Sequence, residues 1–361
     1  MPVTPLPYIA FAQDHYPGAR FNLACSNVPP QDPSQFDVPQ HVFNAEPGHL
    51  AAQAREVLAS RYGVSPSQVV LTLGCSGANA SMAALLGPGA ALLVEQPGYE
   101  PMVATPLTLG LEVAPLPRTP DTWTLDPDRV EASLTPSTRA VWLTNPHNPS
   151  GTVLSAKTLQ TLAERLGRRG ILLYVDEVYL DFAGPLGELS AARLGDHVVI
   201  SSSLTKVYGL GALRFGWMVA PEPIARQLNL LQIHLLGSPP SATLAIGLAA
   251  LNDLEGLKER ASAHLKDRHI VLERALTAAQ GFAWTTPSVG IVGVLQISGV
   301  TDDMAFAQAL IAQEEVTLAP GHFFGLPGQF RLGFGTTEAE LLEGLERLTR
   351  FARAWREEGH G

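Results

Sequence analysis

A lysine, a serine and an arginine lie close together in one polar segment of the sequence. Lys206 follows a serine-rich run that includes Ser203, and Arg214 comes eight residues after the lysine. A partly desolvated lysine has a lowered pKa and can attack an aldehyde as a nucleophile. Ser203 and Arg214 have the groups to hold an anion between them. The alternative is a lysine on a flexible surface loop, where most lysines are found.

A carboxylate stands at the end of a predicted buried strand. Asp176 directly follows the apolar run from Ile171 to Val175, and Tyr179 comes three residues later. A carboxylate in that position needs a partner or solvent. The segment therefore indicates either a polar cleft that both residues face or an ordinary carboxylate that caps a helix.

Two further loops could bind an anion or a phenolate. The loop Asn145–Gly151 holds two prolines and two asparagines, so its backbone is restricted and its amides can donate hydrogen bonds. The loop Gly74–Gly77 contains Cys75 and Ser76 and precedes a predicted helix, where backbone N–H groups can approach an anion. Each loop by itself also fits an ordinary turn.

These segments must be positioned by an alternating series of strands and helices. We predict strands over residues 69–73, 91–94, 111–114, 140–143, 171–175, 198–201 and 215–219, and helices over 49–62, 78–86, 100–109 and 157–166. Short apolar strands separated by helices predict an α/β fold, with a mostly parallel central sheet covered by helices on both faces. Ligands of such sheets bind at the carboxyl ends of the strands, where the polar segments fall.

The pattern changes after Ala220. We predict helices over 224–234, 242–251 and 257–279, a strand over 291–297, a helix over 304–313, a strand over 329–332 and a helix over 338–355. This order predicts a smaller α+β domain. We therefore expect an irregular N-terminal arm at 1–48 that contributes to the small domain and the active site, a large domain at 49–245 and a small C-terminal domain at 246–361.

Composition excludes several classes of protein. The 361 residues are 46% apolar and only 16% charged, which excludes a disordered chain. The net charge is −10 and no segment is densely basic, so we expect neither nucleic acid nor a membrane surface as a partner. The two cysteines have no metal-binding spacing, and we expect no metal. The N-terminus does not resemble a signal peptide, and no apolar run could span a membrane. We expect a soluble, cytoplasmic protein.

In combination, the segments resemble the class I/II aminotransferases, a family of pyridoxal-phosphate (PLP) enzymes. The motifs NPHNPSG, DEVY and SSLTK…GLGALRFG occur in the family's order, and the resemblance extends from about Gly48 to the C-terminus. The arm sequence ARFNLACSNVPP is similar to the family's N-terminal segment, which enters the active site. The resemblance implies the PLP-dependent transferase fold type I. It also implies transfer of an amino group from an L-amino acid to a 2-oxo acid through a Lys-bound pyridoxal 5'-phosphate, in amino acid metabolism.

The resemblance also implies a role for individual residues. Lys206 is similar to the lysine that binds the cofactor and moves protons, and Asp176 to the partner of the pyridine nitrogen. Tyr179 and Asn148 match the donors to the cofactor's ring oxygen. The remaining matches are Cys75, Ser76, Ser203 and Arg214 for the phosphate, Tyr99 for stacking on the ring, Arg331 for the substrate carboxylate, and Asn27 as a further substrate contact.

Two positions depart from the family pattern. Phe43 stands where the family often has a tyrosine that reaches the partner subunit's phosphate, and Cys75 stands where a small residue or serine is usual. The family's active site is normally completed by a second subunit, so we expect a homodimer. Arg20, His147 and His234 are possible pocket residues, but surface positions are the favoured interpretation of all three.

Other functions remain open. The same scaffold supports C–S β-lyases, decarboxylases and cyclases similar to capreomycidine synthase, and all of them would use Lys206 and Asp176. A non-catalytic cofactor-binding regulator usually has a basic helix-turn-helix module before this domain, and residues 1–48 contain none. A nucleotide-binding α/β protein with Gly74–Gly77 as its phosphate loop would leave Lys206 and Asp176 unexplained.

Overall fold

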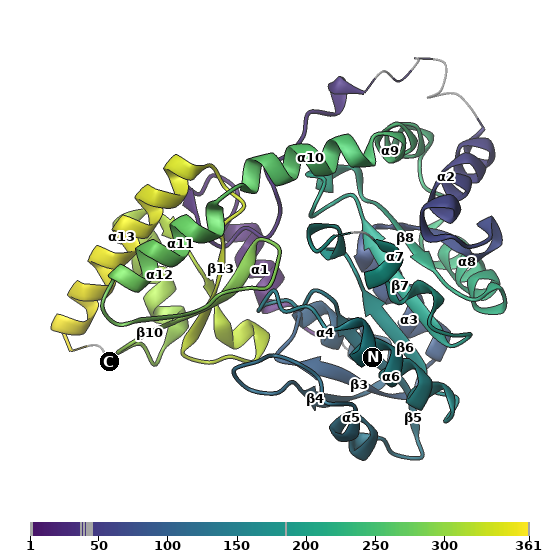
Figure 1. Cartoon of the computed structure of the whole chain (residues 1–361), viewed down its shortest axis with the longest axis horizontal. Coiled ribbons are helices and arrows are strands. Elements are labelled where there is room, and N and C mark those ends of the chain that lie inside the picture. Colours follow the sequence, from purple (N-terminus) through teal and green to yellow (C-terminus); the bar gives the residue numbers. More distant parts are fainter. Residues whose placement is uncertain (1–2, 37, 39, 41–45, 185, 360–361) are drawn as a thin grey trace.

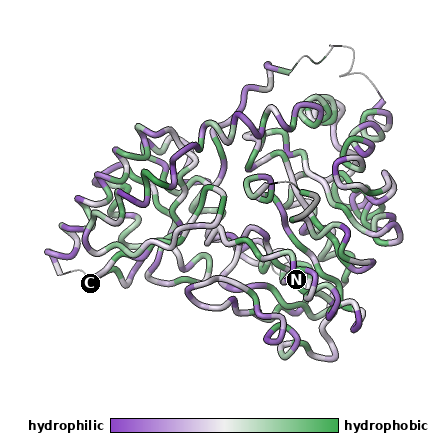
Figure 2. Tube along the Cα trace, viewed as in Figure 1, coloured by the Kyte–Doolittle hydropathy of each residue, from purple (hydrophilic) through white to green (hydrophobic). Residues whose placement is uncertain are grey.

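The computed structural model describes residues 3–36, 38, 40, 46–184 and 186–359. Figure 1 shows two β-sheets, each with its own helices, and helix α10 (Leu254–Leu265) running from one group to the other. Hydrophobic residues follow the strands inside both groups, whereas hydrophilic residues are frequent along the outer helices and loops (Figure 2). In the described part of the chain, no helix has the length and hydropathy of a membrane span.

The large sheet has seven strands in the order β2-β8-β7-β6-β5-β3-β4. Its strands are β2 (Val69–Leu73), β3 (Ala91–Gln96), β4 (Glu112–Pro117), β5 (Thr138–Thr144), β6 (Leu172–Asp176), β7 (Val198–Ser203) and β8 (Phe215–Val219). Strand β8 is antiparallel to β2 and β7, and every other neighbouring pair is parallel. The predicted fold class, with a mostly parallel central sheet, is therefore confirmed.

Apolar side chains cover both faces of the large sheet. On β5, Val141 and Leu143 belong to one buried cluster and Ala140 and Trp142 to the opposite one, as the alternation of a strand requires. The surrounding helices are α2 (Pro47–Tyr62), α3 (Gly74–Leu86), α4 (Glu100–Thr108), α5 (Pro127–Ser133), α6 (Ala156–Gly167), α7 (Leu186–Leu189), α8 (Glu222–Leu236) and α9 (Ser241–Asn252). The near-continuous apolar strands of the sequence thus reflect burial on two faces.

The small sheet is antiparallel, with the strand order β12-β13-β10-β9. Its strands are β9 (Phe282–Thr285), β10 (Val292–Ile297), β12 (Ala319–Pro320) and β13 (Gln329–Gly333), and its helices are α11 (Arg268–Ala278), α12 (Asp303–Glu314) and α13 (Glu338–Glu357). Thr337 and Glu340 form a capping box that starts α13. A short pair of parallel strands, β1 (Phe21–Asn22) and β11 (Val316–Thr317), attaches the N-terminal segment to this part of the molecule.

Two predictions about elements are wrong. The N-terminal arm is not irregular throughout, because residues Pro7–His15 form helix α1, which buries Tyr8 and Phe11 against the small sheet's apolar cluster. The single helix predicted over 257–279 is two helices, α10 and α11, because the chain turns at Asp267 with φ +62°. Asp tolerates this left-handed conformation better than most residues. The domain division at residues 48 and 245 stays a prediction, and Phe43 lies outside the described residues.

Candidate active site

The sheet topology brings the predicted polar segments to one edge of the large sheet. Asp176 and Ser203 are the last residues of β6 and β7, and the Asn145 loop follows β5. Strand β8 runs antiparallel, so Arg214, just before its first residue, lies beside the ends of β2 and β7. Segments separated by up to about 140 residues therefore share one edge, as expected for parallel strands.

Asp176 is a buried carboxylate at that edge. Its Oδ1 accepts a hydrogen bond of 3.0 Å from the Val178 N–H, and no ion pair to it is found among the residues that the structure describes. Burial raises the pKa of Asp176 to about 6, although the Val178 N–H, the Cys75 thiol and the charge of Lys206 lower it. The site therefore holds a carboxylate that a bound cation would stabilise in its ionised form.

Lys206 lies near Asp176 and is held by the N-terminal segment. Its Nζ donates a hydrogen bond of 3.0 Å to Ser26 Oγ, and its carbonyl accepts one of 3.1 Å from the Val28 N–H. The Tyr179 hydroxyl donates to the Ser26 carbonyl at 3.0 Å. Segment 26–28 therefore fixes the surroundings of both Lys206 and Tyr179.

The N-terminal segment packs closely on the loop after Lys206, which explains why residue 209 is a glycine. A Cβ at Gly209 would lie 2.4 Å from the Pro29 carbonyl oxygen, and Gly209 has φ +67°. Glycine is the residue that tolerates both restrictions without strain. The glycine-rich sequence after Lys206 thus lets the arm pack directly on this loop.

The loop Gly74–Gly77 is the first turn of α3 rather than a loop that precedes it. Arg214 Nη2 lies 3.3 Å from the Leu73 carbonyl oxygen and 3.4 Å from Ser76 Oγ, and both Ser76 and Arg214 are exposed. A Cβ at Gly74 would lie 2.8 Å from Arg214 Nη2. The helix N-terminus, the hydroxyl and the guanidinium together suit a phosphate-sized anion.

Cys75 and Ser203 lie deeper than Ser76. The Cys75 thiol lies near Asp176, and burial together with that carboxylate raises the pKa of the thiol. Ser203 is fully buried, and its Oγ accepts a bond of 3.3 Å from the Thr205 N–H. The Cys75 side chain thus lies toward Asp176, which leaves its main-chain N–H as the group suited to a phosphate contact.

Arg331 lies in the middle of β13 with its side chain buried under helix α1. Its Nη2 donates to the Tyr8 hydroxyl and to the Ala24 carbonyl, each at 2.8 Å, and its Nη1 donates to Asn148 Oδ1 at 3.2 Å. Burial would lower the pKa of Arg331, but the nearby phenols, chiefly Tyr8, raise it. The structure thus joins Arg331 of the small sheet to the Asn148 loop of the large one.

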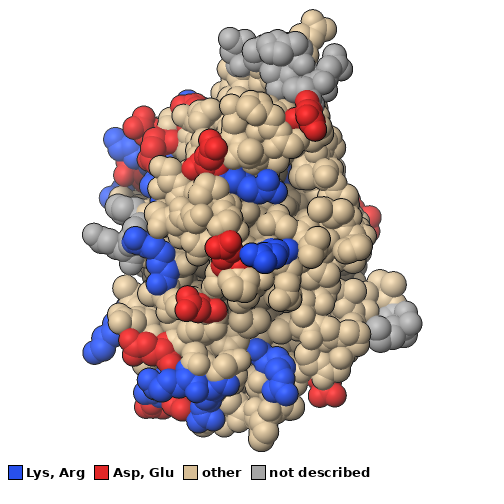
Figure 3. Space-filling view, turned by 90° about the vertical axis from the view of Figure 1, so that its right-hand side faces the viewer, with Lys and Arg blue, Asp and Glu red and all other residues tan. Residues whose placement is uncertain are grey.

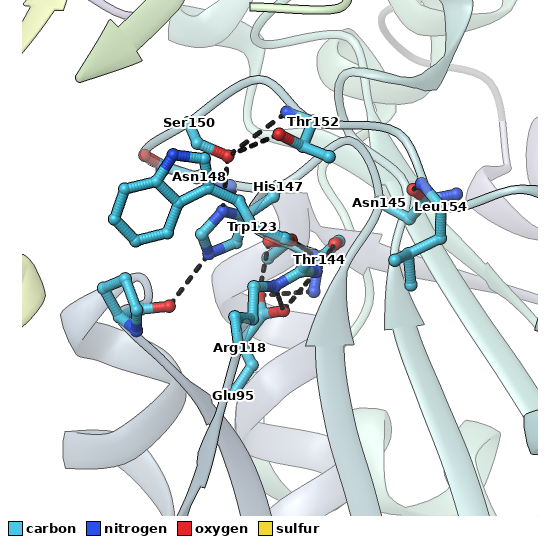
Figure 4. Close-up of polar contacts among 11 residues, drawn as sticks. Glu95, Arg118, Trp123, Thr144, Asn145, His147, Asn148, Ser150, Thr152 and Leu154 are labelled. Atoms are coloured by element: carbon cyan, nitrogen blue, oxygen red, sulfur yellow. Dashed lines mark hydrogen bonds and ion pairs between the residues drawn. The ribbon is translucent and has the colours of Figure 1, made fainter. Parts of the chain in front are cut away.

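A buried ion pair supports the Asn148 loop (Figure 4). Arg118 Nε and Nη2 donate to Glu95 Oε2 at 2.8 and 2.5 Å, and both side chains are fully buried. Glu95 Oε1 accepts from the Thr144 N–H at 2.7 Å and from its hydroxyl at 2.5 Å. Thr144 Oγ1 in turn accepts from the Asn148 N–H at 3.1 Å. This network positions the backbone of Asn148.

His147 is buried, so its predicted surface position is wrong. Its ring nitrogens lie 2.7 Å from Ser150 Oγ and 2.8 Å from the Pro97 carbonyl oxygen, and the Trp123 ring stacks against it (Figure 4). Burial and the charge of Arg118 lower the pKa of His147 well below its usual value. A neutral imidazole thus stabilises the loop from its buried side.

The other two residues for which we predicted surface positions, Arg20 and His234, are exposed.

The last two predicted site residues differ in their surroundings. Burial raises the pKa of Tyr99, and Tyr8, Tyr179 and Asp176 raise it further, so its hydroxyl lies within the electrostatic reach of the site. The polar groups of the Asn27 side chain make local contacts, to the Val28 carbonyl and the Cys25 thiol. Tyr99 thus lies near the other candidate site residues, whereas the Asn27 side chain forms its hydrogen bonds with neighbouring residues of its own segment.

Comparison with known proteins identifies the family. The model of the family "Aminotransferase class I and II" matches residues 9–348. The chain belongs to this family. An arginine–pyruvate transaminase of Pseudomonas aeruginosa is 31% identical over 302 residues, which cover 80% of this chain and 76% of that protein. An aspartate/prephenate aminotransferase of Thermus thermophilus is 26% identical over 341 residues, covering 87% of this chain and 88% of that protein.

Solved structures have the same fold. A PLP-dependent aminotransferase from Streptococcus suis superimposes with a TM-score of 0.88 at 22% identity, over 98% of this chain and 99% of the other. The PLP-dependent cyclase OrfR gives a TM-score of 0.85 at 26% identity over 98% of both chains. The fold is therefore that of the fold-type I PLP enzymes. The chain is therefore a PLP-dependent enzyme of the aminotransferase family, and its cofactor is pyridoxal phosphate.

The residues at the sheet edge fit this cofactor. Asp176 is a buried carboxylate without an ion pair among the described residues, which suits a protonated pyridine nitrogen. The N-terminus of α3, Ser76 and Arg214 suit a phosphate dianion. The amine of Lys206 is the group required to bind an aldehyde. The donor set thus matches the three polar parts of pyridoxal phosphate.

Sequence reasoning missed three groups of this site. Tyr8 contacts Arg331, Ser26 contacts Lys206, and Thr144 joins Glu95 to Asn148. Thr144 directly precedes the Asn145 loop, a position that could have drawn attention to it. Tyr8 and Ser26 lie far from their partners in sequence. Ser26 belongs to the arm sequence that resembles the family's N-terminal segment, whereas Tyr8 carries no local signal.

Proposed function

We propose that the enzyme transfers an amino group from an L-amino acid to a 2-oxo acid, with the cofactor bound to Lys206. One observation carries the proposal: an amine from the loop after β7, a buried carboxylate at the end of β6 and a buried guanidinium on β13 lie close together. The charge of Lys206 affects the pKa of both Asp176 and Tyr8, and the Tyr8 hydroxyl accepts a hydrogen bond from Arg331. A substrate held by its carboxylate at Arg331 would thus present its amino end to Lys206.

In this proposal each residue of the site has its own role in binding or in proton transfer. When bound, pyridoxal phosphate supplies an electron sink next to the substrate's Cα. Asp176 would keep the pyridine nitrogen protonated, and Lys206 Nζ would take and return the proton at Cα. Arg331 would hold the substrate's carboxylate. Contacts with the cofactor's phosphate would come from Ser76, Ser203, Arg214 and the main chain of Cys75, and Tyr99 would pack on its ring.

Tyr179 and Asn148 are the proposed donors to the cofactor's ring oxygen. The Tyr179 proton points to the Ser26 carbonyl, and Asn148 Oδ1 accepts from Arg331, which leaves the amide Nδ2 of Asn148 to donate. Tyr179 would have to exchange the Ser26 carbonyl for the cofactor. Asn27 as a substrate contact and the cytoplasmic location stay predictions.

The oligomeric state is part of the proposal. Four of the exposed large apolar side chains lie on α8, namely Leu230, Ile233, Leu235 and Leu236. Leu230 and Ile233 line a groove of about 680 Å³ between α8 and the start of α2. On that side of the molecule, acidic and basic side chains lie in mixed groups, and wide areas beside them are uncharged (Figure 3). Such a surface favours contact with a second copy of the chain, and we infer a homodimer.

A cyclase is the second candidate. The structural similarity to OrfR, at 26% identity and nearly full coverage, supports a cyclisation as the alternative reaction. Cyclisation, β-elimination and decarboxylation would all use the same Lys206 and Asp176, so the products must distinguish them.

The visible absorption of the PLP-loaded protein tests the proposal. Amino acids are added one at a time without any oxo acid. We expect certain amino acids to bleach the lysine-bound band and a 2-oxo acid to restore it, which identifies the donor class. Release of pyruvate, ammonia or carbon dioxide would assign a lyase or decarboxylase, and a ring-closed amino acid would assign a cyclase.

Lys206→Ala provides the matched test of the lysine. The variant should fold, as judged by circular dichroism, but should lack the lysine-bound band and all turnover. Lys258→Ala, on α10, removes a lysine whose Nζ lies 3.5 Å from the Gly184 carbonyl and should keep both. Full activity in Lys206→Ala would refute the proposal.

A further inference from the structure

The arginine proposed to bind the substrate's carboxylate is covered by Tyr8 of α1. Only about 1% of Arg331 is exposed. Its guanidinium carbon lies 5.2 Å from the centre of the Tyr8 ring and 4.7 Å from that of Phe324, so both rings take part in cation–π contacts. The Tyr8 hydroxyl accepts the 2.8 Å bond from Nη2. A carboxylate that reaches Arg331 must therefore meet Tyr8.

Tyr8 is held in place from both parts of the molecule. Its backbone N–H donates to the Glu100 carboxylate of α4 at 3.0 and 3.3 Å. Its ring lies 5.0 Å from that of Phe324 and 6.0 Å from those of Phe323 and Tyr99. In Figure 1, α1 lies between the two sheets. A side chain fixed in this way has little conformational entropy to lose when it binds a ligand.

The hydroxyl hydrogen of Tyr8 is available for a hydrogen bond to a ligand. An arginine only donates, so the Tyr8 oxygen is the acceptor in its bond to Arg331. Burial raises the pKa of Tyr8, but the charges of Arg331 and Lys206 outweigh this effect and lower it. The Tyr8 oxygen thus accepts from Arg331, and no hydrogen bond that the Tyr8 hydroxyl donates is found among the described residues, so its hydrogen can point toward an anion between Arg331 and Lys206.

Not every N–H group of Arg331 has a hydrogen-bond partner among the described residues. Nη2 donates to Tyr8 and Ala24 and also lies 3.5 Å from the Tyr16 hydroxyl, Nη1 uses one hydrogen on Asn148, and Nε is buried without a hydrogen-bond partner among the described residues. A carboxylate has about four lone-pair positions and needs more donors than one arginine nitrogen supplies. Tyr8 is the nearest further donor whose oxygen already contacts that guanidinium.

We propose that Tyr8 is a substrate-positioning residue that donates its hydroxyl hydrogen to the same carboxylate that Arg331 binds. This inference rests on the proposed function, because it takes Arg331 as the carboxylate site. Arg331 orients the phenol, and the two groups together would favour a carboxylate over a carboxamide, which has one oxygen acceptor fewer. Helix α1 is then part of the substrate site and not only its cover.

Tyr8→Phe tests the proposal because it removes one oxygen and keeps the ring. The probes are the unreactive carboxylates propionate, 3-phenylpropionate and glutarate, with propionamide and 3-phenylpropionamide for comparison. Binding to the PLP-loaded protein is measured by calorimetry. Loss of a hydrogen bond to a charged group should raise the carboxylate Kd roughly ten- to a hundred-fold and affect the amides much less. The KM for the amino donor should rise by a similar factor, with a smaller change in kcat.

Two variants serve as references. Arg331→Met should weaken carboxylate binding at least as much as Tyr8→Phe. Tyr62→Phe removes another buried phenol, one that accepts a 3.1 Å bond from Trp217 Nε1 in the core, and should leave the carboxylate Kd unchanged. The visible spectrum of the ligand-free protein should be the same in Tyr8→Phe and the wild type.

The outcomes separate this inference from the proposed function. If Arg331→Met weakens carboxylate binding and Tyr8→Phe does not, Tyr8 has no positioning role and the proposed function stands. A Tyr8→Phe variant that loses only thermal stability also overturns the inference. If the wild type transaminates no amino acid but binds carboxylates through Arg331 and Tyr8, the proposed function fails and this inference stands. A wild type that binds no carboxylate overturns both.

Discussion

Asp176 and Glu177 are consecutive carboxylates whose side chains have different surroundings. Asp176 faces the candidate site, whereas Glu177 accepts bonds of 2.7 Å from the Ala191 N–H and the Ser190 hydroxyl. Side chains of neighbouring residues at a strand end point in opposite directions. Both are buried, and burial raises the pKa of both carboxyls, to about 6 for Asp176 and to about 8 for Glu177.

The raised pKa of Glu177 predicts a pH-dependent stability. Between about pH 4.5, the ordinary pKa, and about pH 8, the folded protein holds a proton that the unfolded chain has released. The free energy of unfolding should therefore fall as pH rises through this window, by on the order of a few kcal/mol. Glu177→Gln should remove much of that fall, so that it gains stability relative to the wild type at pH 8.

Urea unfolding at pH 5 and pH 8 measures the effect. Glu164→Gln, which changes an exposed carboxylate on α6, should keep the wild-type pH dependence. The same pH dependence in Glu177→Gln and the wild type would show that Glu177 is not the group responsible.

Two elements, α3 and β8, jointly form the anion-binding corner. A Cβ at Gly216 of β8 would lie 2.6 Å from the Gly74 Cα, and one at Gly74 would lie 2.8 Å from Arg214 Nη2. Gly74 also has φ +67°. The close approach of the two elements thus depends on glycine at both positions.

Gly74→Ala should therefore weaken cofactor binding. The left-handed backbone costs an alanine about 1–2 kcal/mol, and the methyl group would displace the Arg214 guanidinium from Ser76. Loss of one charge-assisted contact should raise the Kd for pyridoxal phosphate roughly ten-fold or more. Absorbance titration of the cofactor-free protein measures it. Gly170→Ala has a similar positive φ with nothing within 4 Å and should change only stability. An equal effect of both variants on cofactor binding would contradict the argument.

Thr144, the last residue of strand β5, supports the backbone of Asn148. Thr144→Val keeps the shape of the side chain but removes the bonds of its hydroxyl to Glu95 and from the Asn148 N–H. An unsatisfied buried group costs about 1–3 kcal/mol, so thermal stability should fall. Because Asn148 contacts Arg331, the KM for the amino acid should rise as well.

Thr138→Val, at the other end of the same strand, is the matched control. Its hydroxyl accepts from the Thr135 N–H at 3.0 Å, far from the site. We expect it to lose stability with an unchanged KM. If Thr144→Val behaves in the same way, the network stabilises the strand without positioning Asn148.

The N-terminal segment connects the two sheets in the molecule as a whole. Its strand β1 pairs with β11, helix α1 covers Arg331, and segment 26–28 holds Lys206. The site is therefore built from both sheets and from a segment that precedes them in sequence. Any change in how the sheets are held together should alter the distance between Lys206 and Arg331.

The proposed homodimer predicts the effect of a surface charge. Ile233→Glu places a carboxylate on the exposed apolar side of α8, where Ile233 is 62% exposed. Analytical ultracentrifugation should find a dimeric wild type and a monomeric variant with lowered activity. Ile270→Glu, on α11 and 37% exposed, should stay dimeric. A wild type that is monomeric and active would refute the dimer.

Strand-end motifs and the alternation of apolar strands with helices could be predicted from the sequence because their signals are local. The period of a buried strand, the glycine at the start of α3 and the polar residue at or after the end of each strand all lie within a few positions of one another. The run from Ile171 to Val175 followed by Asp176 is such a case, and β6 ends at Asp176. The mostly parallel sheet and the family followed from these signals.

Only the tertiary structure decided which distant groups meet. Tyr8 lies 323 residues from Arg331 and Ser26 lies 180 residues from Lys206, and no local pattern couples such positions. Helix α1 carries a weak amphipathic pattern, and its burial depends on Phe323 and Phe324. His147 is polar by type and buried because Ser150 and the Pro97 carbonyl satisfy its ring. Local residue preferences determine the elements, whereas long-range packing and hydrogen bonding determine which side chains face the substrate.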